Sequence, residues 1–432
     1  MNAYFYTLGC KVNQYETQAM AALMRQSGYT TAAYHGGDIG DGVLVVNSCT
    51  VTGESDRKLR SLLRRFRRES PHAVLVLTGC MPQAFPEEAE QLTEADIVLG
   101  NACRRDLPRY IEHYLTLGHR LVAITPHDRE IEPLKIDDFD EHTRAFVKIE
   151  DGCNRFCSYC IIPYARGRVR SKPLEALQDE LTALAKNGYR EIVLVGINLT
   201  AYGQDLGLSL ADAAELADRI DGLARVRLGS LEPDHMTDDL IARLAACRKL
   251  CPQFHLSLQS GCDDTLRRMN RHYDTAAYTA VCDKLRRAFP GCALTTDVMV
   301  GFAGETEEEF DASLAFVKAT RFAKVHVFPY SRRDGTKAAA LPDQVSASQK
   351  AARAQRMRVM CDAVRREILE EAIGLPVEML AETRAEDGGT LGYTRDYLPS
   401  RLDEAVPPGE TVPAVAYAVE HDMLLVRRID PV

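Results

Sequence analysis

Short apolar segments, each followed by an amphipathic helical pattern, recur along most of this chain of 432 residues. Alternating strands and helices require right-handed crossovers and build parallel sheets, whose strands all end at the same edge. Ligands of such folds bind at that edge, in the loops that follow the strands. The expected fold class is therefore α/β, and residues directly after the strands are the first candidates for a functional site.

The first part of the chain, residues 1–118, is expected to form a parallel α/β domain. Strands are predicted at residues 3–8, 43–46, 73–77 and 97–99, with helices near Gln14, Glu54, Phe85 and Arg104. Cys10, Cys49 and Cys80 directly follow the first three strands. Free cysteine is often a small buried hydrophobe, but core packing alone would scatter these residues. We expect a joint ligand set at one sheet edge, with Cys103 as a possible fourth ligand that we interpret as a core residue.

Residues 119–143 carry many charges and little periodicity, so they are interpreted as a linker. Residues 144–373 then contain six strand–helix units. Their strands are predicted at residues 145–149, 191–195, 225–228, 255–258, 293–300 and 324–328. Six such units make a partial (βα)6 barrel, in which the chemistry lies in the loops after the strands.

The pattern changes again in residues 374–432, where short alternating strands are separated by turns rich in glycine and proline. These strands are predicted at residues 377–381, 391–397, 411–419 and 423–426. The segment is expected to be a small antiparallel β-barrel of the size of an accessory binding module.

Three further cysteines, Cys153, Cys157 and Cys160, follow the first predicted barrel strand with the spacing C-x3-C-x2-C. A structural zinc site needs four protein ligands and usually takes them as two separated pairs. A cubane iron–sulfur cluster can be held by three thiolates, which leaves one iron open. The spacing therefore favours a 4Fe-4S cluster whose open iron binds a further molecule.

The composition is that of an ordinary soluble protein, with 46% hydrophobic and 27% charged residues. No apolar run approaches the roughly 18 residues of a membrane span, and the first residues lack the features of a signal peptide. Thirteen cysteines without an export signal indicate thiols and metal ligands rather than disulfides. We expect a cytoplasmic protein that makes no membrane contact.

The net charge of −9 argues against indiscriminate binding of nucleic acids, so any RNA site must be a local basic patch. The best candidate is residues 57–68, with seven basic residues in twelve and no acidic one. Leu59, Leu62, Leu63 and Phe66 have the spacing of one buried helix face, so the arginines lie on the other. A solvated helix face is the alternative. The position of this helix directly after the Cys49 loop favours RNA.

All three parts together resemble the radical S-adenosylmethionine (SAM) methylthiotransferase family over essentially the full chain. Residues 7–17, Thr-Leu-Gly-Cys-Lys-Val-Asn-Gln-Tyr-Glu-Thr, resemble the branch that acts on N6-threonylcarbamoyladenosine in tRNA. The isopentenyladenosine branch typically has Gln-Met-Asn after this cysteine, and the ribosomal-protein branch Pro-Lys-Asn. Further agreement lies in residues 146–152, 161–168, 256–261 and 296–302.

The resemblance implies two 4Fe-4S clusters, one on Cys153, Cys157 and Cys160 and an auxiliary one on Cys10, Cys49 and Cys80. It implies two SAM molecules per turnover: one methylates a sulfur, and one is cleaved to a radical that removes hydrogen from C2 of the adenine. An unactivated aromatic C–H offers no useful acidic proton, so no catalytic side chain is expected and the cofactors carry the chemistry. The expected partners are tRNA and an external one-electron reductant, and a monomer is expected. The C-terminal module would be a TRAM domain.

Positions in the family further place SAM contacts at Gly196, Asn198, Glu232, Gln259 and Gly301. A packing or turn role is the alternative for each of these residues.

Two charge features need structural explanation. Arg166 and Arg168 follow the cysteine motif and could meet the SAM carboxylate or tRNA phosphate, with a solvated loop as the alternative. Residues 377–432 carry five basic and eleven acidic residues, a net charge of 5 − 11 = −6, which is unfavourable for phosphate binding.

Other functions remain open on the sequence alone. The acidic C-terminal module would suit a methylthiotransferase acting on an aspartate of a basic ribosomal protein, and isopentenyladenosine in tRNA is another possible substrate. A different class is a non-catalytic iron–sulfur protein that binds RNA or senses redox state. A third alternative is a radical enzyme with a single cluster, whose N-terminal cysteines bind zinc.

Overall fold

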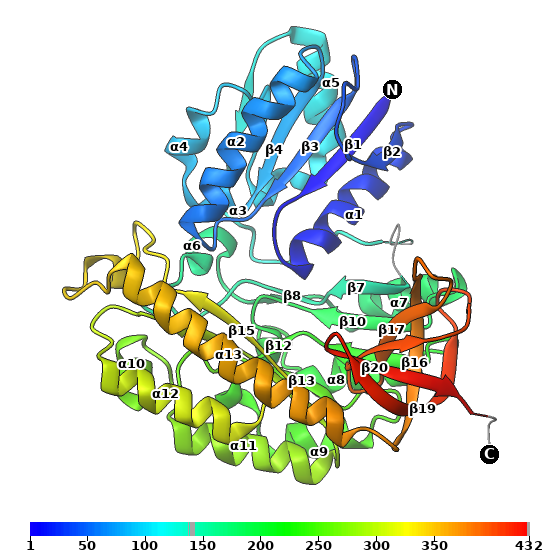
Figure 1. Cartoon of the computed structure of the whole chain (residues 1–432). Helices are drawn as coiled ribbons and strands as arrows, with labels where there is room; N and C mark the ends of the chain where they lie inside the picture. The colour runs from blue at the N-terminus through cyan, green and yellow to red at the C-terminus, as the bar shows by residue number, and fades with distance from the viewer. Residues whose placement is uncertain (137, 139–142, 430–432) are drawn as a thin grey trace.

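The computed structural model describes residues 1–136, 138 and 143–429. The N-terminal sheet and its helices lie above a partial barrel, and a small closed barrel lies against one side of that barrel (Figure 1). The acidic run predicted as part of the linker lies outside the described residues except for Asp138. None of the helices in the described ranges has the length and apolar character needed to cross a membrane.

The N-terminal domain is a parallel sheet of six strands in the order β2-β1-β3-β4-β5-β6. Its strands are β1 (Asn2–Thr7), β2 (Thr30–Ala33), β3 (Val43–Ser48), β4 (Val74–Gly79), β5 (Ile97–Leu99) and β6 (Leu121–Ala123). The four predicted strands are confirmed. The sequence did not indicate the edge strands β2 and β6, because they bury few side chains and so lack a continuous apolar run. Strand β6 lies beyond residue 118, inside the segment predicted as a linker.

Helices cover both faces of this sheet. A separate hydrophobic cluster lies between the sheet and the helices on each face. They are α1 (Lys11–Gln26), α2 (Gly53–Glu69), α3 (Cys80–Ala84), α4 (Pro86–Glu90), η1 (Asn101–Asp106) and α5 (Leu107–Leu117). Helix α2 begins where the Thr52 hydroxyl accepts a hydrogen bond from the Ser55 N–H at 3.2 Å, which satisfies a free donor of the first turn. Its four predicted apolar residues are buried, so the amphipathic helix expected at residues 57–68 is confirmed.

The middle domain is a partial barrel of parallel strands. Its strands are β7 (Arg144–Lys148), β10 (Glu191–Val195), β11 (Arg225–Leu228), β12 (Ser230–Leu231), β13 (Gln253–Leu256), β14 (Ala293–Val300) and β15 (Lys324–Pro329). All six predicted strands are present close to their predicted positions. They form two sheets, in the orders β11-β10-β7 and β12-β13-β14-β15, and an isolated bridge pairs Val226 of β11 with Leu250. Among the described residues no pairing joins β7 to β15, so the barrel is open between them.

The remaining elements of the middle domain lie on the outside of the barrel and in its loops (Figure 1). The helices are α6 (Ile162–Arg166), α7 (Leu174–Lys186), α8 (Leu210–Arg219), α9 (Asp238–Ala246), α10 (Asp263–Arg268), α11 (Thr275–Ala288), α12 (Glu307–Thr320) and α13 (Ala347–Glu371), with short turns η2 (Leu199–Ala201), η3 (Pro233–His235) and η4 (Lys337–Ala340). Strands β8 (Glu150–Asp151) and β9 (Arg170–Ser171) pair with each other and flank the cysteine loop.

The C-terminal domain is a closed five-stranded barrel in the order β16-β17-β18-β20-β19. Its strands are β16 (Pro376–Arg384), β17 (Thr390–Thr394), β18 (Pro399–Leu402), β19 (Thr411–Glu420) and β20 (Met423–Arg428). Strand β18 was not predicted. It pairs in parallel with β20, whereas the other neighbours are antiparallel, so the expected antiparallel barrel contains one parallel pair.

Arginines of the middle domain attach the C-terminal barrel. The Arg227 Nε lies 2.7 Å from Glu191 Oε1, and its Nη2 donates to the carbonyl of Thr394 at 3.0 Å. The Arg225 Nη2 lies 2.7 Å from Glu378 Oε1. Since Arg225, Arg227 and Glu191 are all buried, these contacts fix the C-terminal barrel against the edge formed by β7, β10 and β11.

Candidate functional site

Cys153, Cys157 and Cys160 lie in the loop between β8 and α6. Gly152 at the start of this loop has φ +92°, and a Cβ there would lie 2.0 Å from the carbonyl oxygen of Arg168, so only glycine fits. The Cys153 N–H donates to the carbonyl of Gly167 at 3.0 Å, and the Cys160 N–H to that of Cys157 at 3.0 Å. These bonds hold the three thiols in one loop after the first barrel strand, as predicted.

Polar side chains from later barrel loops reach this cysteine loop. Arg271 donates from Nη1 to the Cys157 sulfur at 3.2 Å and pairs through Nη2 with Glu232 at 2.5 Å. The Asn198 amide nitrogen lies 4.0 Å from the Cys153 sulfur. Hydrogen bonds of this kind stabilise negative charge on sulfur.

Cys153 and Cys160 are poor acids in this environment. Burial raises the pKa of Cys153 to about 12, and burial together with the neighbouring Cys157 raises the pKa of Cys160 to about 12. Metal ligation requires the thiolate, so binding of a metal cluster would release these protons.

The three N-terminal cysteines share one edge of the first sheet. Cys10 is the N-cap residue of α1, Cys49 follows β3, and Cys80 is the first residue of α3. The strands that precede them, β1, β3 and β4, are direct neighbours, which confirms the juxtaposition expected from the strand order. Burial and the nearby Cys80 and Cys10 sulfurs raise the pKa of Cys49 to about 12.

Asparagine side chains order this edge. Asn13 accepts a hydrogen bond from the Cys10 thiol at 3.3 Å and donates to the Asn47 side-chain oxygen at 3.2 Å, so it ties the first loop to β3. A Cβ on Gly79 would lie 2.3 Å from the carbonyl oxygen of Ser48, so glycine is required before Cys80.

Cys103 does not belong to this set. It is buried in the hydrophobic cluster beneath α5, and its sulfur lies 3.4 Å from the Thr125 hydroxyl. The interpretation as a core residue is confirmed.

A buried arginine joins the two cysteine sets. Arg166 donates from Nε to the Cys80 sulfur at 3.2 Å and from Nη2 to Glu16 Oε2 at 3.0 Å. Its Nη1 lies 3.4 Å from Asp151 Oδ2, two residues before Cys153. The suggested contact with SAM or tRNA phosphate is wrong for Arg166, because its side chain is fully buried and its donors are already used. Arg168 remains exposed.

Two further cations complete a charge network around Glu16. Lys148 places its Nζ 2.9 Å from Glu16 Oε1 and 3.1 Å from Asp151 Oδ2, and Arg104 Nη1 lies 2.5 Å from Glu16 Oε2. Burial disfavours the charged carboxylate, but Arg104, Arg166 and Lys148 hold the pKa of Glu16 well below its usual range. The network fixes the N-terminal domain relative to the barrel.

Two of the predicted SAM contacts adjoin the cysteine loop, Asn198 directly and Glu232 through Arg271. Gly196 lies beside them, since a Cβ there would lie 2.6 Å from the carboxylate of Glu150, which also accepts the Asn198 N–H at 2.8 Å. Arg271 itself was not predicted, because nothing in its sequence surroundings distinguishes it from neighbouring basic residues.

The other two predicted contacts, Gln259 and Gly301, lie at the ends of neighbouring strands. Gln259 has φ +69° and exchanges main-chain hydrogen bonds with Asp297 and Met299 of β14. The Gly301 N–H donates to Glu305 at 2.6 Å. No hydrogen bond joins either residue to the cysteine loop in the described part of the chain, so a backbone role accounts for what is observed.

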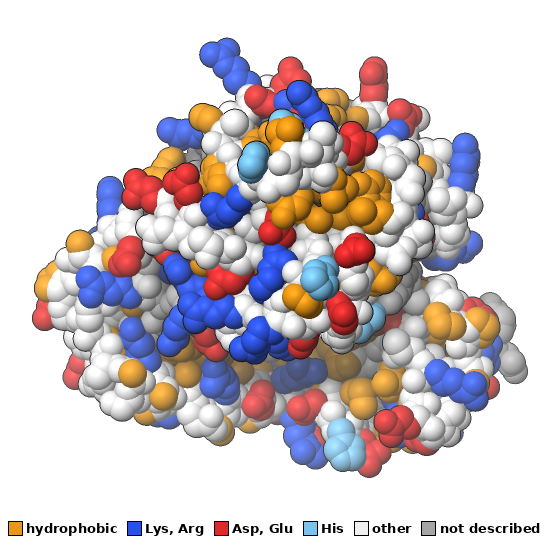
Figure 2. Space-filling view, turned by 90° about the horizontal axis from the view of Figure 1, so that it is seen from above, with side chains coloured by type: hydrophobic (Ala, Val, Ile, Leu, Met, Phe, Trp, Pro, Cys, Tyr) orange, Lys and Arg blue, Asp and Glu red, His pale blue; other side chains and the backbone are white. Residues whose placement is uncertain are grey.

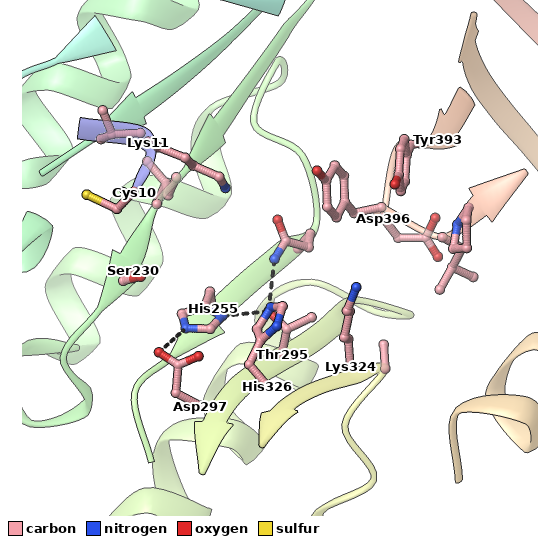
Figure 3. Close-up of a pocket in the computed structure, with 18 of the residues that line it drawn as sticks. Cys10, Lys11, Ser230, His255, Thr295, Asp297, Lys324, His326, Tyr393 and Asp396 are labelled. Carbon is pink, nitrogen blue, oxygen red and sulfur yellow. Dashed lines mark hydrogen bonds and ion pairs between the residues drawn. The ribbon is translucent and has the colours of Figure 1, made fainter. Parts of the chain in front are cut away.

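A cavity of about 730 Å³ lies where the three domains meet. Figure 3 shows Cys10 and Lys11 at one side of it, His255, Asp297, Lys324 and His326 of the barrel strands below, and Tyr393 and Asp396 of the C-terminal barrel at the other side. Burial and the charges of Arg144 and Arg227 lower the pKa of Lys11 to about 8. The cavity therefore connects the loop of one cysteine set with the interior of the barrel.

Comparison with known families agrees with this architecture. Residues 147–317 match the family model of the radical SAM superfamily, and residues 2–100 match "Uncharacterized protein family UPF0004". A solved radical S-adenosylmethionine methyltransferase, TsrM from Kitasatospora setae with cobalamin and a [4Fe-4S] cluster bound, superposes with a TM-score of 0.57. It covers 78% of this chain and 77% of its own at 14% identity, so the likeness is one of fold. Fold and cysteine loop define a radical SAM protein, a class that uses a 4Fe-4S cluster and SAM.

Relatives of similar sequence identify the family within the radical SAM class to which the chain belongs. A threonylcarbamoyladenosine tRNA methylthiotransferase of Bacillus subtilis is 38% identical over 91% of this chain and 88% of its own. The Thermotoga maritima protein of the same name is 37% identical over 91% and 89%. A tRNA-2-methylthio-N(6)-dimethylallyladenosine synthase of Clostridium novyi is 36% identical over 91% and 88%. The chain belongs to the radical SAM methylthiotransferase family and is an enzyme of methylthio transfer.

Proposed function

We propose that this enzyme transfers a methylthio group to C2 of N6-threonylcarbamoyladenosine in tRNA. The observation that carries this proposal is the pairing of two three-cysteine sets through Arg166, with Cys10 of one set lining the cavity that opens into the barrel. The relatives from Bacillus subtilis and Thermotoga maritima are named as methylthiotransferases of this nucleoside in tRNA. The enzyme acts as a cytoplasmic monomer and receives electrons from an external one-electron reductant.

Both cysteine sets suit 4Fe-4S clusters, because each supplies three thiols and so leaves one iron open. Cys153, Cys157 and Cys160 would hold the cluster that cleaves SAM. The N-terminal set would hold the auxiliary cluster. When bound, the clusters and two SAM molecules per turnover supply the electron, the radical and the methylated sulfur.

The chain's own residues bind and orient these groups. Arg271 and Asn198 donate hydrogen bonds toward two of the barrel thiols, and Glu232 holds the Arg271 guanidinium in place. Gly196 leaves the space for Glu150 to fix the Asn198 backbone, and Gln259 and Gly301 shape the neighbouring strand ends. We propose Gly196, Asn198 and Glu232 as the SAM-contacting residues that the present geometry supports best.

We further propose that helix α2 contacts the tRNA backbone. Arg57, Arg60, Ser61, Arg64 and Arg68 line a groove of about 430 Å³ on its outer face. Figure 2, which looks down on the N-terminal domain, shows basic side chains gathered left of the centre, on the side where Figure 1 draws α2. Phosphate contacts by arginine supply most of the sequence-independent affinity for RNA.

The nucleosides of tRNA from a deletion strain test the proposed function. Mass spectrometry should show threonylcarbamoyladenosine without its methylthio group. Loss of the methylthio group from dimethylallyladenosine, or from a ribosomal aspartate, would assign the enzyme to another branch. A fully reconstituted protein that releases no 5′-deoxyadenosine from SAM under anaerobic reducing conditions would contradict the enzymatic function and favour a redox sensor.

A further inference from the structure

Two lysines in the cavity at the domain junction have no carboxylate partner among the residues that the structure describes. Lys11 is the first residue of α1, next to Cys10, and Lys324 is the first residue of β15. Both residues line the cavity and keep part of their surface exposed, although burial of the Lys11 ammonium group lowers its pKa. Figure 3 shows them extending into it from different walls. The Lys11 Nζ lies 5.8 Å from the centre of the Phe146 ring, and neither ammonium group forms a hydrogen bond or ion pair within residues 1–136, 138 and 143–429.

The acidic residues of the cavity are already engaged. Asp297 Oδ2 lies 3.3 Å from His255 Nε2, and the Asp396 carboxylate accepts a hydrogen bond from the Thr394 hydroxyl. Arg365 adds a further cation to the wall. Three cationic side chains and two carboxylates therefore line the cavity, so the formal charge of its lining is 3 − 2 = +1.

The same lysines decide against a metal ion at the nearby histidines. His255, Asp297 and His326 place possible ligand atoms within 4.8 Å of one another. Burial lowers the pKa of His326, Asp297 raises it, and the charges of Lys324 and Lys11 lower it, so a cation there would face the charge of both ammonium groups. An anion is the ligand that the cavity favours.

Filling this cavity with an apolar group would remove water from both ammonium groups without providing new hydrogen bonds. This desolvation would cost free energy. A carboxylate would instead form charge-assisted hydrogen bonds with them. The threonylcarbamoyl group ends in a carboxylate, whereas the dimethylallyl group is entirely apolar. The difference between these two N6 substituents is thus a difference in charge.

We propose that Lys11 and Lys324 form a carboxylate subsite that binds the threonyl carboxylate and selects this substrate over adenosines with an apolar N6 substituent. The proposal rests on the proposed function and names the specificity-determining residues of the same site. The polar Gln253–Thr295 pair, whose side chains lie 3.2 Å apart in the cavity wall, offers hydrogen bonds to the rest of the substituent.

Affinities of the full-length, cluster-reconstituted enzyme for three anticodon stem-loops test this subsite. The stem-loops carry threonylcarbamoyladenosine, its uncharged methyl ester, or N6-dimethylallyladenosine. We expect Lys11→Gln and Lys324→Gln each to weaken binding of the carboxylate stem-loop at least about tenfold. Binding of the ester and of the dimethylallyl stem-loop should not change. Esterification should cost the wild type a similar factor and the variants little.

Three controls separate charge recognition from other effects. Lys11→Arg and Lys324→Arg keep the charge and should restore most of the affinity. Lys186→Gln removes an exposed lysine at the end of α7 and should change nothing. The iron content of the Lys11 variants should equal that of the wild type, which shows that the neighbouring Cys10 is undisturbed.

Equal losses for all three stem-loops would overturn the subsite, because they would place the lysines on tRNA phosphate. An undiminished preference for the carboxylate stem-loop in both glutamine variants would also overturn it. If the wild type still methylthiolates threonylcarbamoyladenosine in tRNA, the subsite alone has failed. If it instead modifies only dimethylallyladenosine, the proposed function has failed as well.

Discussion

At the residue scale, the two cysteine sets and Arg166 carry most of the functional argument. The cysteines could be predicted, because their spacing and their positions after strands follow from the sequence alone. The role of Arg166 could not, because its partners Cys80 and Glu16 come from a different domain. In the sequence, an arginine beside a cysteine motif suggests a contact with a ligand. Arg166 is instead buried, and its positive charge has a structural role.

Replacing Arg166 should therefore destabilise the protein. In Arg166→Gln the buried carboxylates of Glu16 and Asp151 lose one of their cations, and we expect a loss of about 3 kcal/mol in unfolding free energy. Urea denaturation monitored by circular dichroism measures this. Arg168→Gln, two residues later and exposed, is the matched control and should change stability by less than about 0.5 kcal/mol. An Arg166→Gln protein as stable as this control would contradict the network.

Removing one cysteine set should halve the iron. Replacement of Cys10, Cys49 and Cys80 by alanine should lower the iron content from about eight to about four per chain and leave the other cluster in place. Elemental analysis counts the metals, and electron paramagnetic resonance of the reduced protein identifies the remaining cluster. Wild-type protein with about four irons and one zinc would support the alternative of an N-terminal zinc site.

At the element scale, α2 shows what periodicity can and cannot predict. Its buried stripe was predicted because the spacing of the leucines is local. The acids that neutralise part of its basic face come from other elements: Glu88 of α4 lies 2.5 Å from Arg60, and Glu94 lies 3.3 Å from Arg64. No periodicity within α2 contains that information. Edge strands such as β2 were not predicted for a related reason, because they are defined by their pairing with a neighbouring strand, here β1.

Charge reversal on α2 should weaken tRNA binding. The triple variant Arg57→Glu, Arg64→Glu and Arg68→Glu removes three possible phosphate contacts, so the slope of log affinity against log salt should become shallower by about 2 to 3. Filter binding of tRNA at several salt concentrations measures this slope. Arg105→Glu, on an exposed site of η1, is the control. Unchanged affinity in the triple variant would exclude α2 as a docking surface.

At the scale of the whole molecule, contacts between domains explain part of the negative charge of the C-terminal barrel. Glu378 pairs with Arg225, and Glu382 lies 2.5 Å from Arg144 of the middle domain, so part of its negative charge attaches the barrel rather than facing solvent. The net charge of residues 377–432 is therefore a poor guide to their partner. The three-domain order could be predicted from the change in periodicity along the chain, but the interface could not, because it depends on arginines that look ordinary in the sequence.

Glu191, at the centre of this interface, should make the unfolding free energy depend on pH in the acidic range. Burial alone would raise its pKa, but Arg227, Arg144 and Arg225 lower it below the ordinary 4.5. A carboxylate with a lowered pKa adds stability above its unfolded-state pKa and loses it as pH falls through its folded-state pKa. We expect Glu191→Gln to be less stable than the wild type by about 3 kcal/mol at pH 7.

This difference should shrink progressively below pH 4.5. Denaturation at a series of pH values measures it. Asp218→Asn on α8 is the control, because this carboxylate accepts a hydrogen bond from the Lys249 N–H and the asparagine oxygen can still accept it. A constant difference between wild type and Glu191→Gln across the acid range would contradict the ionised state of Glu191.

The cavity at the domain junction depends on all three domains. Residues 9–12 of the N-terminal loop and residues 393 and 396–399 of the C-terminal barrel line it together with residues of the middle domain. We expect a chain truncated before residue 376 to lack one wall of this cavity while it retains all six cysteines of the two sets.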